Sequence, residues 1–281
     1  MPSLKRFLKA YWELLRLEHG IMYGLGVLIG IFLGGGAEFN VLLLAFLTAV
    51  FLEASAFALN DYLDYEVDVA NKRLDRPLVR GDLSKKTALA SSIIFFPLGL
   101  FSAFLISIKA LLFVLVVTIL AYAYNAKLKE FGLIGNAYVA FTMSAPFIFG
   151  GVISEFNQAV LLLSLIAFLS GLGREIMKGI EDIEGDALRD VKSVARVHGI
   201  ETAVKLSSLL FILAVILSFF PPILIAEYYD LKYGIPVAIT DFILISVALR
   251  LYRSPDRISK FRKETLLAML LGLIGFLAGT F

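Results

Sequence analysis

The sequence predicts an all-α, polytopic membrane protein. Of its 281 residues, 59% are hydrophobic, and the mean hydropathy of +0.85 is far above that of a soluble globular domain. Apolar stretches long enough to cross a hydrocarbon layer of about 30 Å recur along the whole chain. The 24 Phe, 22 Gly and 11 Tyr suit helices that pack closely through small residues and meet lipid through large ones.

A short amphipathic helix is expected first, followed by nine membrane-crossing helices. Residues 3–16 place apolar side chains at helical spacing beside basic residues, as in a helix that lies on the membrane surface. No small-residue cleavage site follows, so we expect no removable signal peptide. The third and fourth spans are separated by a tight turn at Ser107-Ile108-Lys109. The nine candidate spans cover residues 17–36, 41–60, 88–108, 110–125, 134–153, 159–177, 203–224, 234–251 and 265–281.

The basic residues provide an independent check on this arrangement. If the N-terminus is cytoplasmic, nine spans put all of the 26 Lys and Arg residues except Lys109 and Lys232 on the cytoplasmic side. Membrane proteins show this excess of basic residues in their cytoplasmic segments. We therefore expect a cell-membrane protein with a cytoplasmic N-terminus, cytoplasmic polar loops and an external C-terminus. The cytoplasmic loops would cover residues 61–87, 126–133, 174–205 and 250–264.

We expect one domain over residues 1–281. The two long polar loops follow the second and sixth spans, which run in the same direction, and each loop begins with an acidic cluster. This favours a parallel repeat of helices 1–4 and 5–8 with a ninth helix added, although coincidence is an open alternative. We expect no nucleic acid and no obligate protein partner.

The absence of cysteine excludes disulfides, thiolate metal ligands and thiol nucleophiles. Any metal must then be held by oxygen atoms or by the two histidines. His19 and His198 are too far apart in the sequence to suggest a zinc site. Oxygen ligands favour a hard cation.

The first acidic cluster ends the second span and reads Asn60-Asp61-Tyr62-Leu63-Asp64-Tyr65-Glu66-Val67-Asp68. Asn60, Asp64 and Asp68 recur every fourth residue, so on a continuing helix they would share one face, about 6 Å apart along the axis. Like charges in this arrangement repel each other. A bound cation would relieve the repulsion, and the pattern therefore predicts a metal site.

The second acidic cluster ends the sixth span, where Asp182, Asp186 and Asp190 again recur every fourth residue. Two facing rows of carboxylates suit Mg²⁺, which takes one or two carboxylates and completes its shell with water and substrate phosphate. A diphosphate bridged by metal would be the natural ligand. The predicted metal ligands are Asn60, Asp64, Asp68, Asp182 and Asp186, and the four acids among them are also the predicted catalytic residues.

Basic residues in the same loops could neutralise the remaining phosphate charge. Each of them also satisfies the cytoplasmic charge bias and could contact lipid headgroups instead. We favour that second role for Lys72, Arg73 and Arg80. The predicted substrate-binding residues are Arg76, Lys127, Arg174, Lys178, Asn60 and Asp61.

These motifs resemble those of the UbiA superfamily of intramembrane prenyltransferases. The first family motif, N-D-x-x-D-x-x-x-D, matches at Asn60, Asp61, Asp64 and Asp68. The second, K-D-x-x-D-x-x-G-D, matches at Lys178, Asp182, Gly185 and Asp186. Gly179 stands where the family usually has an acid, so no metal role is assigned to it. Further similarity at Asp75-Arg76-Pro77 and Tyr124-Asn125-Ala126-Lys127 extends the resemblance over most of the chain.

The resemblance implies nine helices around a central cavity, Mg²⁺ as cofactor, and transfer of a prenyl group from an isoprenoid diphosphate to an acceptor. The chain is most similar to the archaeal branch that makes digeranylgeranylglyceryl phosphate by transferring a geranylgeranyl group to geranylgeranylglyceryl phosphate, a lipid-like phosphorylated acceptor. The similarity lies in the segment Gly173-Arg174-Glu175-Ile176, which precedes the second motif. Enzymes with aromatic acceptors more often have tyrosine in place of Arg174. An aromatic acceptor of the quinone, tocopherol, haem or chlorophyll type is the alternative.

Two more distant functions fit the sequence less well. Acids between spans also mark the ion pathways of transporters, but the spacing of the motifs argues against a transporter. The membrane alcohol phosphotransferases also use clustered aspartates, but neither cluster contains their signature.

Two acids lie inside predicted spans, where a carboxylate is costly unless it faces a cavity or a partner. Glu53 lies two turns before Asn60 on the same helical face. It is expected either to line the active-site cavity or to be a protonated acid bonded to a neighbouring helix. Asp241 is expected to be structural.

Overall fold

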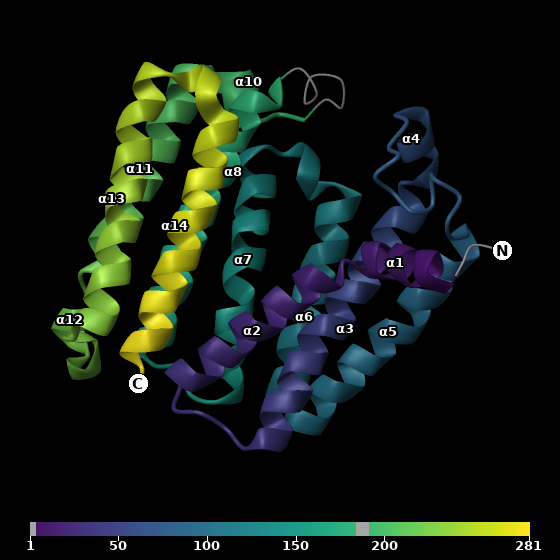
Figure 1. Cartoon of the computed structure of the whole chain (residues 1–281), viewed down its shortest axis with the longest axis horizontal. Helices are drawn as coiled ribbons and strands as arrows, with labels where there is room; N and C mark the ends of the chain where they lie inside the picture. Colours follow the sequence, from purple (N-terminus) through teal and green to yellow (C-terminus); the bar gives the residue numbers. More distant parts are fainter. Residues whose placement is uncertain (1–3, 184–190) are drawn as a thin grey trace.

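The computed structural model describes residues 4–183 and 191–281, and every regular element in these residues is helical (Figure 1). The long helices are α2 (Leu17–Leu33), α3 (Phe39–Leu63), α5 (Lys85–Ile106), α6 (Ile108–Ala126), α7 (Leu133–Ile153), α8 (Gln158–Glu181), α11 (Ile200–Ser218), α13 (Leu231–Arg253) and α14 (Ile258–Gly279). The shorter elements are α1 (Leu4–Leu15), α4 (Tyr65–Ala70), α10 (Val194–His198), α12 (Pro221–Leu224), η1 (Leu128–Glu130), η2 (Ala226–Tyr228) and η3 (Pro255–Arg257).

A helix occupies each of the nine predicted ranges in the described part of the chain, but the number of membrane crossings is not confirmed. Six helices there are long and apolar enough to cross a membrane, and α1 with α2 would add a seventh if the bent pair is one span. The apolar part of α6 is short, covering Ile108–Tyr124. The first two turns of α14 contain four charged residues, Lys260, Arg262, Lys263 and Glu264.

The predicted amphipathic helix is α1, which is separated from α2 by a bend of 49°. Arg16 makes the bend by adopting a left-handed backbone conformation with φ of 44°. One face of α1 packs on α3 and buries Leu14 and Leu15. The other face exposes Leu4, Phe7, Leu8 and Trp12, which is the pattern of a helix at a membrane surface.

The predicted boundary between the third and fourth spans is confirmed at Ser107. Its backbone is extended, with φ of −172°, and its Oγ accepts a hydrogen bond of 3.1 Å from the backbone N–H of Ala110. This side chain caps the N-terminus of α6, satisfying a backbone donor that has no partner within the helix.

The helices form two packed groups joined through α7 and α8. The first group contains α2, α3, α5, α6 and α7, and the second contains α8, α11, α13 and α14. Helices α2 and α7 cross closely because Gly30 and Gly150 lie at the contact. A Cβ on Gly30 would lie 2.4 Å from the carbonyl oxygen of Phe147, and one on Gly150 would lie 2.4 Å from that of Val27. Small residues commonly permit such close crossings in membranes.

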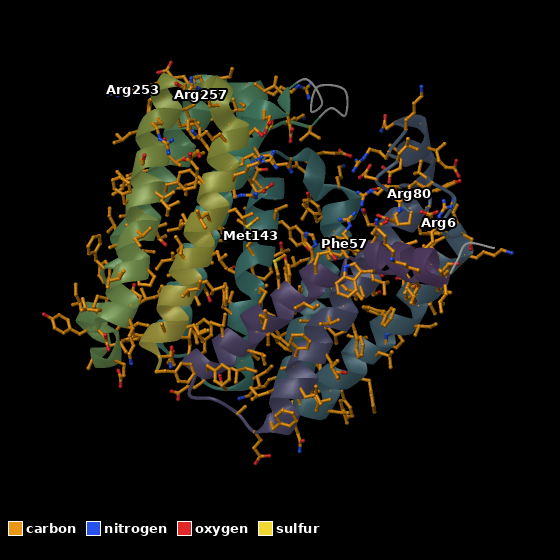
Figure 2. The ribbon with its side chains drawn as sticks, in the orientation of Figure 1. Arg6, Phe57, Arg80, Met143, Arg253 and Arg257 are labelled. Carbon is orange, nitrogen blue, oxygen red and sulfur yellow. The ribbon has the colours of Figure 1, made fainter. Side chains whose placement is uncertain are left out.

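Helices α3 and α8 run in the same direction and end at the same end of the bundle, at the top of Figure 1. The short helices α4 and α10 lie at this end as well. Arg253, in the last turn of α13, and Arg257, in η3, also lie there (Figure 2). The first acidic motif and the described part of the second therefore occupy the same end of the molecule, together with basic residues.

Candidate active site

A cavity of about 360 Å³ lies within the first helix group. Residues of α2, α3, α5, α6 and α7 line it, and most of its wall is apolar. Examples are Val27, Leu52, Phe96, Phe113, Val117 and Phe149. Asn60 and Asp64 line the cavity where α3 ends. The cavity expected from the sequence is therefore present. The helices of the first group line it, and the described residues of the second group do not.

The spacing of the first motif suggested one continuous helix. The structure instead divides the motif between two helices. Helix α3 ends at Leu63 and α4 begins at Tyr65, with Asp64 between them. The helical hydrogen-bond pattern nevertheless continues, since Asp64 N–H donates to Asn60 O at 2.9 Å and Asp68 N–H donates to Asp64 O at 2.8 Å. The Nδ2 of Asn60 donates to Oδ2 of Asp64 at 3.1 Å. The side chains of Asn60 and Asp64 are thus directly paired, and both residues line the cavity.

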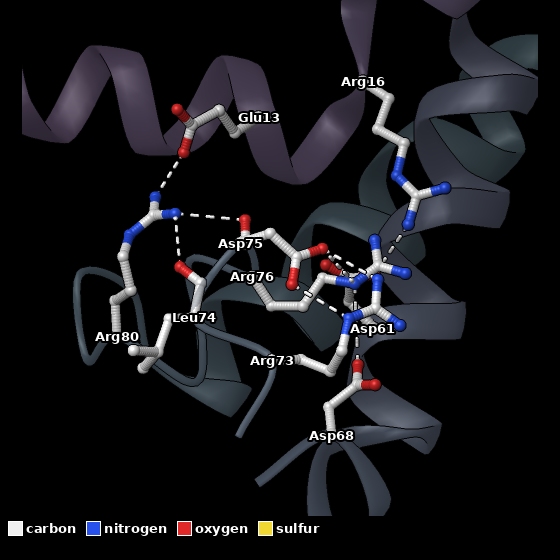
Figure 3. A network of polar contacts seen from close by, with 9 residues as sticks. All are labelled: Glu13, Arg16, Asp61, Asp68, Arg73, Leu74, Asp75, Arg76 and Arg80. Carbon is white, nitrogen blue, oxygen red and sulfur yellow. Dashed lines mark hydrogen bonds and ion pairs between the residues drawn. The ribbon is translucent and has the colours of Figure 1, made fainter. Parts of the chain in front are cut away.

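Asp61 belongs to a network of ion pairs beside the cavity (Figure 3). Its side chain is 2% exposed, and its Oδ1 lies 3.3 Å from a guanidinium nitrogen of Arg16 and 3.3 Å from one of Arg76. The Nε of Arg76 also lies 3.7 Å from Asp68 and 3.9 Å from Asp75. Arg76 therefore joins the buried acid at the end of α3 to the acid on α4 and to the following loop.

Asp68 is buried on α4. Burial raises the pKa of this carboxyl above its usual range, Arg73 lowers it in part, and the neighbouring Asp64 and Asp75 raise it further. Because like charges repel, each ionised carboxylate makes ionisation of its neighbour less favourable. Burial and the neighbouring acids therefore both make the ionised form of Asp68 less favourable.

The loop after α4 is fastened to α1 by arginines. Arg73 holds Asp75 through two hydrogen bonds of 2.9 and 2.7 Å. Arg80 donates to the carbonyl oxygens of Leu74 and Asp75 at 3.1 and 3.0 Å, and it pairs with Glu13 of α1. Arg80 and Arg6 of α1 both bind the carboxylate of Asp82, at 2.8 and 2.7 Å, and they lie side by side in Figure 2. These contacts give Arg73 and Arg80 a structural role.

The second motif is described only as far as Ile183, and the predicted ligand Asp186 lies outside the described residues, as does Asp190. Asp182 ends α8 and is partly exposed. The carboxylate of Glu175 is nearly buried, with Arg174 at 3.5 Å and Lys178 at 3.7 Å. Within the described residues, no part of this motif lines the cavity, and no group of three or more acids or histidines is placed to hold a metal.

Lys127 is exposed at the end of α6. In the turn that follows, Gly132 adopts φ of 38°, and a Cβ there would lie 1.7 Å from the carbonyl oxygen of Lys192. The backbone N–H of Lys192 donates to Glu130 O at 3.0 Å. This loop therefore packs directly against the segment that follows the second motif.

Several residues at the site were not predicted from the sequence. Arg16 was counted only as part of the charge bias, but it pairs with Asp61 and lies 4.2 Å over the ring of Phe57. Tyr138 lines the cavity and stacks on Tyr124 with 4.6 Å between ring centroids. Tyr138 is one of 11 tyrosines in the chain, and nothing in the sequence around it singles it out.

The two acids inside spans take different positions. Of the two positions expected for Glu53, the structure shows the first, because its side chain lines the cavity. Asp241 is buried in the second helix group and accepts a hydrogen bond of 2.7 Å from the Oγ of Ser218. Its carboxylate has a structural partner, as expected.

Comparisons with known proteins agree with this arrangement. The chain matches the UbiA prenyltransferase family over residues 24–277. It is 56% identical to the digeranylgeranylglyceryl phosphate synthase of Archaeoglobus fulgidus, over 100% of this chain and 98% of that protein. A solved structure described as a digeranylgeranylglyceryl phosphate synthase in membranes is 33% identical, with a TM-score of 0.83 and 98% of both chains covered.

A more distant relative shares the fold. It is a UbiA homologue from Archaeoglobus fulgidus bound to DMAPP and Mg²⁺, which is 22% identical with a TM-score of 0.65, over 95% of this chain and 98% of that one. The family match covers most of the chain, and the relative at 56% identity covers all of it. This chain is therefore an integral membrane protein that belongs to the UbiA prenyltransferase family.

Proposed function

We propose that this chain catalyses the Mg²⁺-dependent transfer of a geranylgeranyl group from its diphosphate to geranylgeranylglyceryl phosphate. The observation that carries the proposal is the 56% identity, along the whole chain, with a digeranylgeranylglyceryl phosphate synthase. The cavity supports it, because long apolar walls lead to an amide and a carboxylate at one end. Such a site suits a substrate with a hydrocarbon tail and an anionic head.

The residues at the end of α3 fit a magnesium ion. Asn60 and Asp64 present hard oxygen donors on one side of the cavity, and these are the donors that Mg²⁺ prefers. The related structure with DMAPP and Mg²⁺ is of a protein with the same fold. When bound, Mg²⁺ would stabilise the negative charge that develops on the departing diphosphate oxygens. We assign its ligands to Asn60, Asp64, Asp68, Asp182 and Asp186.

The other residues bind and orient the substrate in this proposal. Arg76, held between Asp61 and Asp68, keeps the first motif in place and leaves positive charge beside it. Lys127, Arg174 and Lys178 compensate phosphate charge from the side of the second motif. The apolar walls exclude water, so that the allylic cation reacts with the acceptor rather than with solvent.

We further propose that the end carrying both motifs faces the cytoplasm, together with the N-terminus, and that the C-terminus is external. The basic residues at this end support the orientation. Cysteines introduced at Lys129 and at Lys232 of the naturally cysteine-free chain would test it. A membrane-impermeant maleimide added to intact cells should label only the cysteine at 232, and labelling of only the one at 129 would reverse the orientation.

Incubation of the purified protein with labelled geranylgeranyl diphosphate and a panel of acceptors tests the function. Geranylgeranylglyceryl phosphate should yield a labelled ether product, and only when Mg²⁺ is present. A product formed from 4-hydroxybenzoate, with none from the glycerol phosphate acceptor, would instead assign the chain to enzymes with aromatic acceptors.

A further inference from the structure

Glu53 lines the cavity on α3, away from the first acidic motif. It precedes Asn60 by seven residues on α3, so it lies about 10 Å farther along the helix. Among the described residues that line the cavity, Glu53 and Asp64 are the carboxylic acids. Asp64 belongs to the proposed metal site, so Glu53 is the acid that this site leaves unused.

The carboxylate of Glu53 has no structural partner. It makes no hydrogen bond or ion pair with another residue in the described part of the chain. Asp241, the other acid within a span, is bonded to Ser218. An acid held inside a membrane helix without such a partner is costly, and such acids are commonly functional.

The surroundings of Glu53 suit a hydroxyl ligand. Arg16, at the junction of α1 and α2, is the charged group that acts on it. Tyr23 of α2 and Tyr138 of α7 are close enough to interact electrostatically with it. From α5 and α6, the titratable group at the cavity wall is Tyr122. The aromatic hydroxyls near the acid are thus those of Tyr23 and Tyr138, in a cavity whose wall is mostly apolar.

The proposed reaction releases a proton. The bond between the allylic carbon and the diphosphate oxygen breaks, and its electron pair leaves with the diphosphate. The hydroxyl oxygen of the glycerol acceptor then forms a bond to the allylic carbon. The hydroxyl proton must pass to a base, because the product is a neutral ether.

We propose that Glu53 is a catalytic residue that accepts a hydrogen bond from the acceptor hydroxyl and takes its proton as the ether bond forms. The inference rests on the proposed function, since it requires an alcohol acceptor. Glu53 becomes a neutral acid in this step and returns the proton to water after the product leaves. Its side chain lines the same cavity as Asn60 and Asp64, so the proposal requires the acceptor to bind in that cavity with its hydroxyl beside Glu53.

The test compares the full-length wild-type protein with Glu53→Gln, Glu53→Asp and Asp241→Asn in lipid nanodiscs. Asp241→Asn is the matched control, because it also converts a carboxyl within a span to an amide. Glu53→Gln should lower kcat by about 100-fold or more, as expected for loss of a general base. The KM for geranylgeranyl diphosphate should change by less than about 2-fold. Glu53→Asp should recover part of the rate, and Asp241→Asn should stay within about 2-fold of wild type.

Two further measurements separate catalysis from structure. The acid limb of the kcat profile against pH in the wild type should be absent in Glu53→Gln. With bridging-oxygen-labelled donor and an acceptor whose hydroxyl is methylated, Glu53→Gln should still scramble the label, because ionisation precedes proton removal. Loss of scrambling and of donor binding in both Glu53 variants would make the residue structural and overturn the inference.

The outcomes also separate this inference from the proposed function. A wild-type protein that leaves the glycerol phosphate acceptor unchanged would overturn the proposed function. Wild-type kcat in Glu53→Gln, with that acceptor converted normally, would overturn only the role of Glu53.

Discussion

The amide of Asn60 donates a hydrogen bond of 3.1 Å to the carboxylate of Asp64 across the last turn of α3. The two side chains lie where the apolar cavity meets the polar end of the bundle. The helix breaks at Asp64, between the end of α3 and the start of α4. The polar chemistry of the site is thus concentrated at one rim of a largely hydrocarbon-lined space.

Replacing Asp64 with Asn should reduce prenyl transfer by at least about 100-fold while the protein stays folded. The substitution keeps the side-chain volume but removes the negative charge that a divalent ion needs. Transfer of labelled geranylgeranyl and size-exclusion profiles would measure the two effects. Glu66→Gln is the control, because Glu66 is an exposed acid of the same motif region that pairs with Lys85 at 3.1 Å. A similar loss of activity in Glu66→Gln would show that the rate depends on the total negative charge of this region and not on Asp64 in particular.

Removing Mg²⁺ with a chelator should abolish both transfer and tight binding of geranylgeranyl diphosphate. The carboxylates would otherwise repel the diphosphate, since like charges face each other without a bridging cation. Isothermal titration of the diphosphate with and without Mg²⁺ measures binding independently of activity. Addition of excess Mg²⁺ should restore it, whereas full binding in the chelator would contradict a metal-bridged site. Asp182→Ala should weaken the same binding.

Replacing Arg76 with Met should destabilise the protein by about 2 kcal/mol, because a buried carboxylate then loses one of its two partners. Asp61 is 2% exposed and would keep only Arg16, at 3.3 Å. Thermal unfolding in detergent measures the change. The double variant Asp61→Asn with Arg76→Met should recover part of the loss. Equal stability of wild type and Arg76→Met would show that the network contributes little.

The contacts between α1 and the loop after α4 should contribute less stability at acidic pH. Hydrogen bonds from Arg80 and Arg6 lower the pKa of Asp82 below its ordinary value of 3.8. A carboxyl with a depressed pKa contributes stability above its unfolded pKa and loses it as the pH falls through its folded pKa. The melting temperature should therefore fall more steeply below about pH 4 in the wild type than in Asp82→Asn. Parallel curves for the two proteins would contradict this.

Gly132→Ala should destabilise the protein by at least about 2 kcal/mol, because strain and a clash act together. The new Cβ would lie 1.7 Å from Lys192 O in a backbone with φ of 38°. Gly81→Ala is the matched control, since Gly81 has φ of 74° with nothing within 4 Å of its added Cβ. That variant should lose only about 1 kcal/mol. Chemical unfolding would rank the two, and equal losses would contradict a tight contact at Gly132.

Local patterns in the sequence predicted the features that depend on neighbouring residues. The spacing of Asn60 and Asp64 predicted adjacent side chains, and the structure pairs them directly. Ser107 marked a helix boundary because a serine can cap the following helix. The composition predicted the helical class because long apolar stretches have few alternatives in a membrane.

Features that depend on distant residues could not be predicted in the same way. The pair of Arg16 with Asp61 joins residues far apart in the chain, and the bend after α1 makes the contact possible. The attachment of Arg80 to Glu13 has the same origin. The break at Asp64 was missed because the helical spacing continues across it. The meeting of the two motifs stays a prediction, since Asp186 lies outside the described residues.

The bend at Arg16 has a mechanical consequence. On one side of the bend, α2 forms part of the cavity wall. On the other side, Glu13 and Arg6 of α1 pair with Arg80 and Asp82 in the loop that follows the first motif. Any sideways displacement of α2 that admitted a lipid-borne substrate would therefore pull on that loop. Entry from the bilayer and the alignment of the charged head would then be coupled motions.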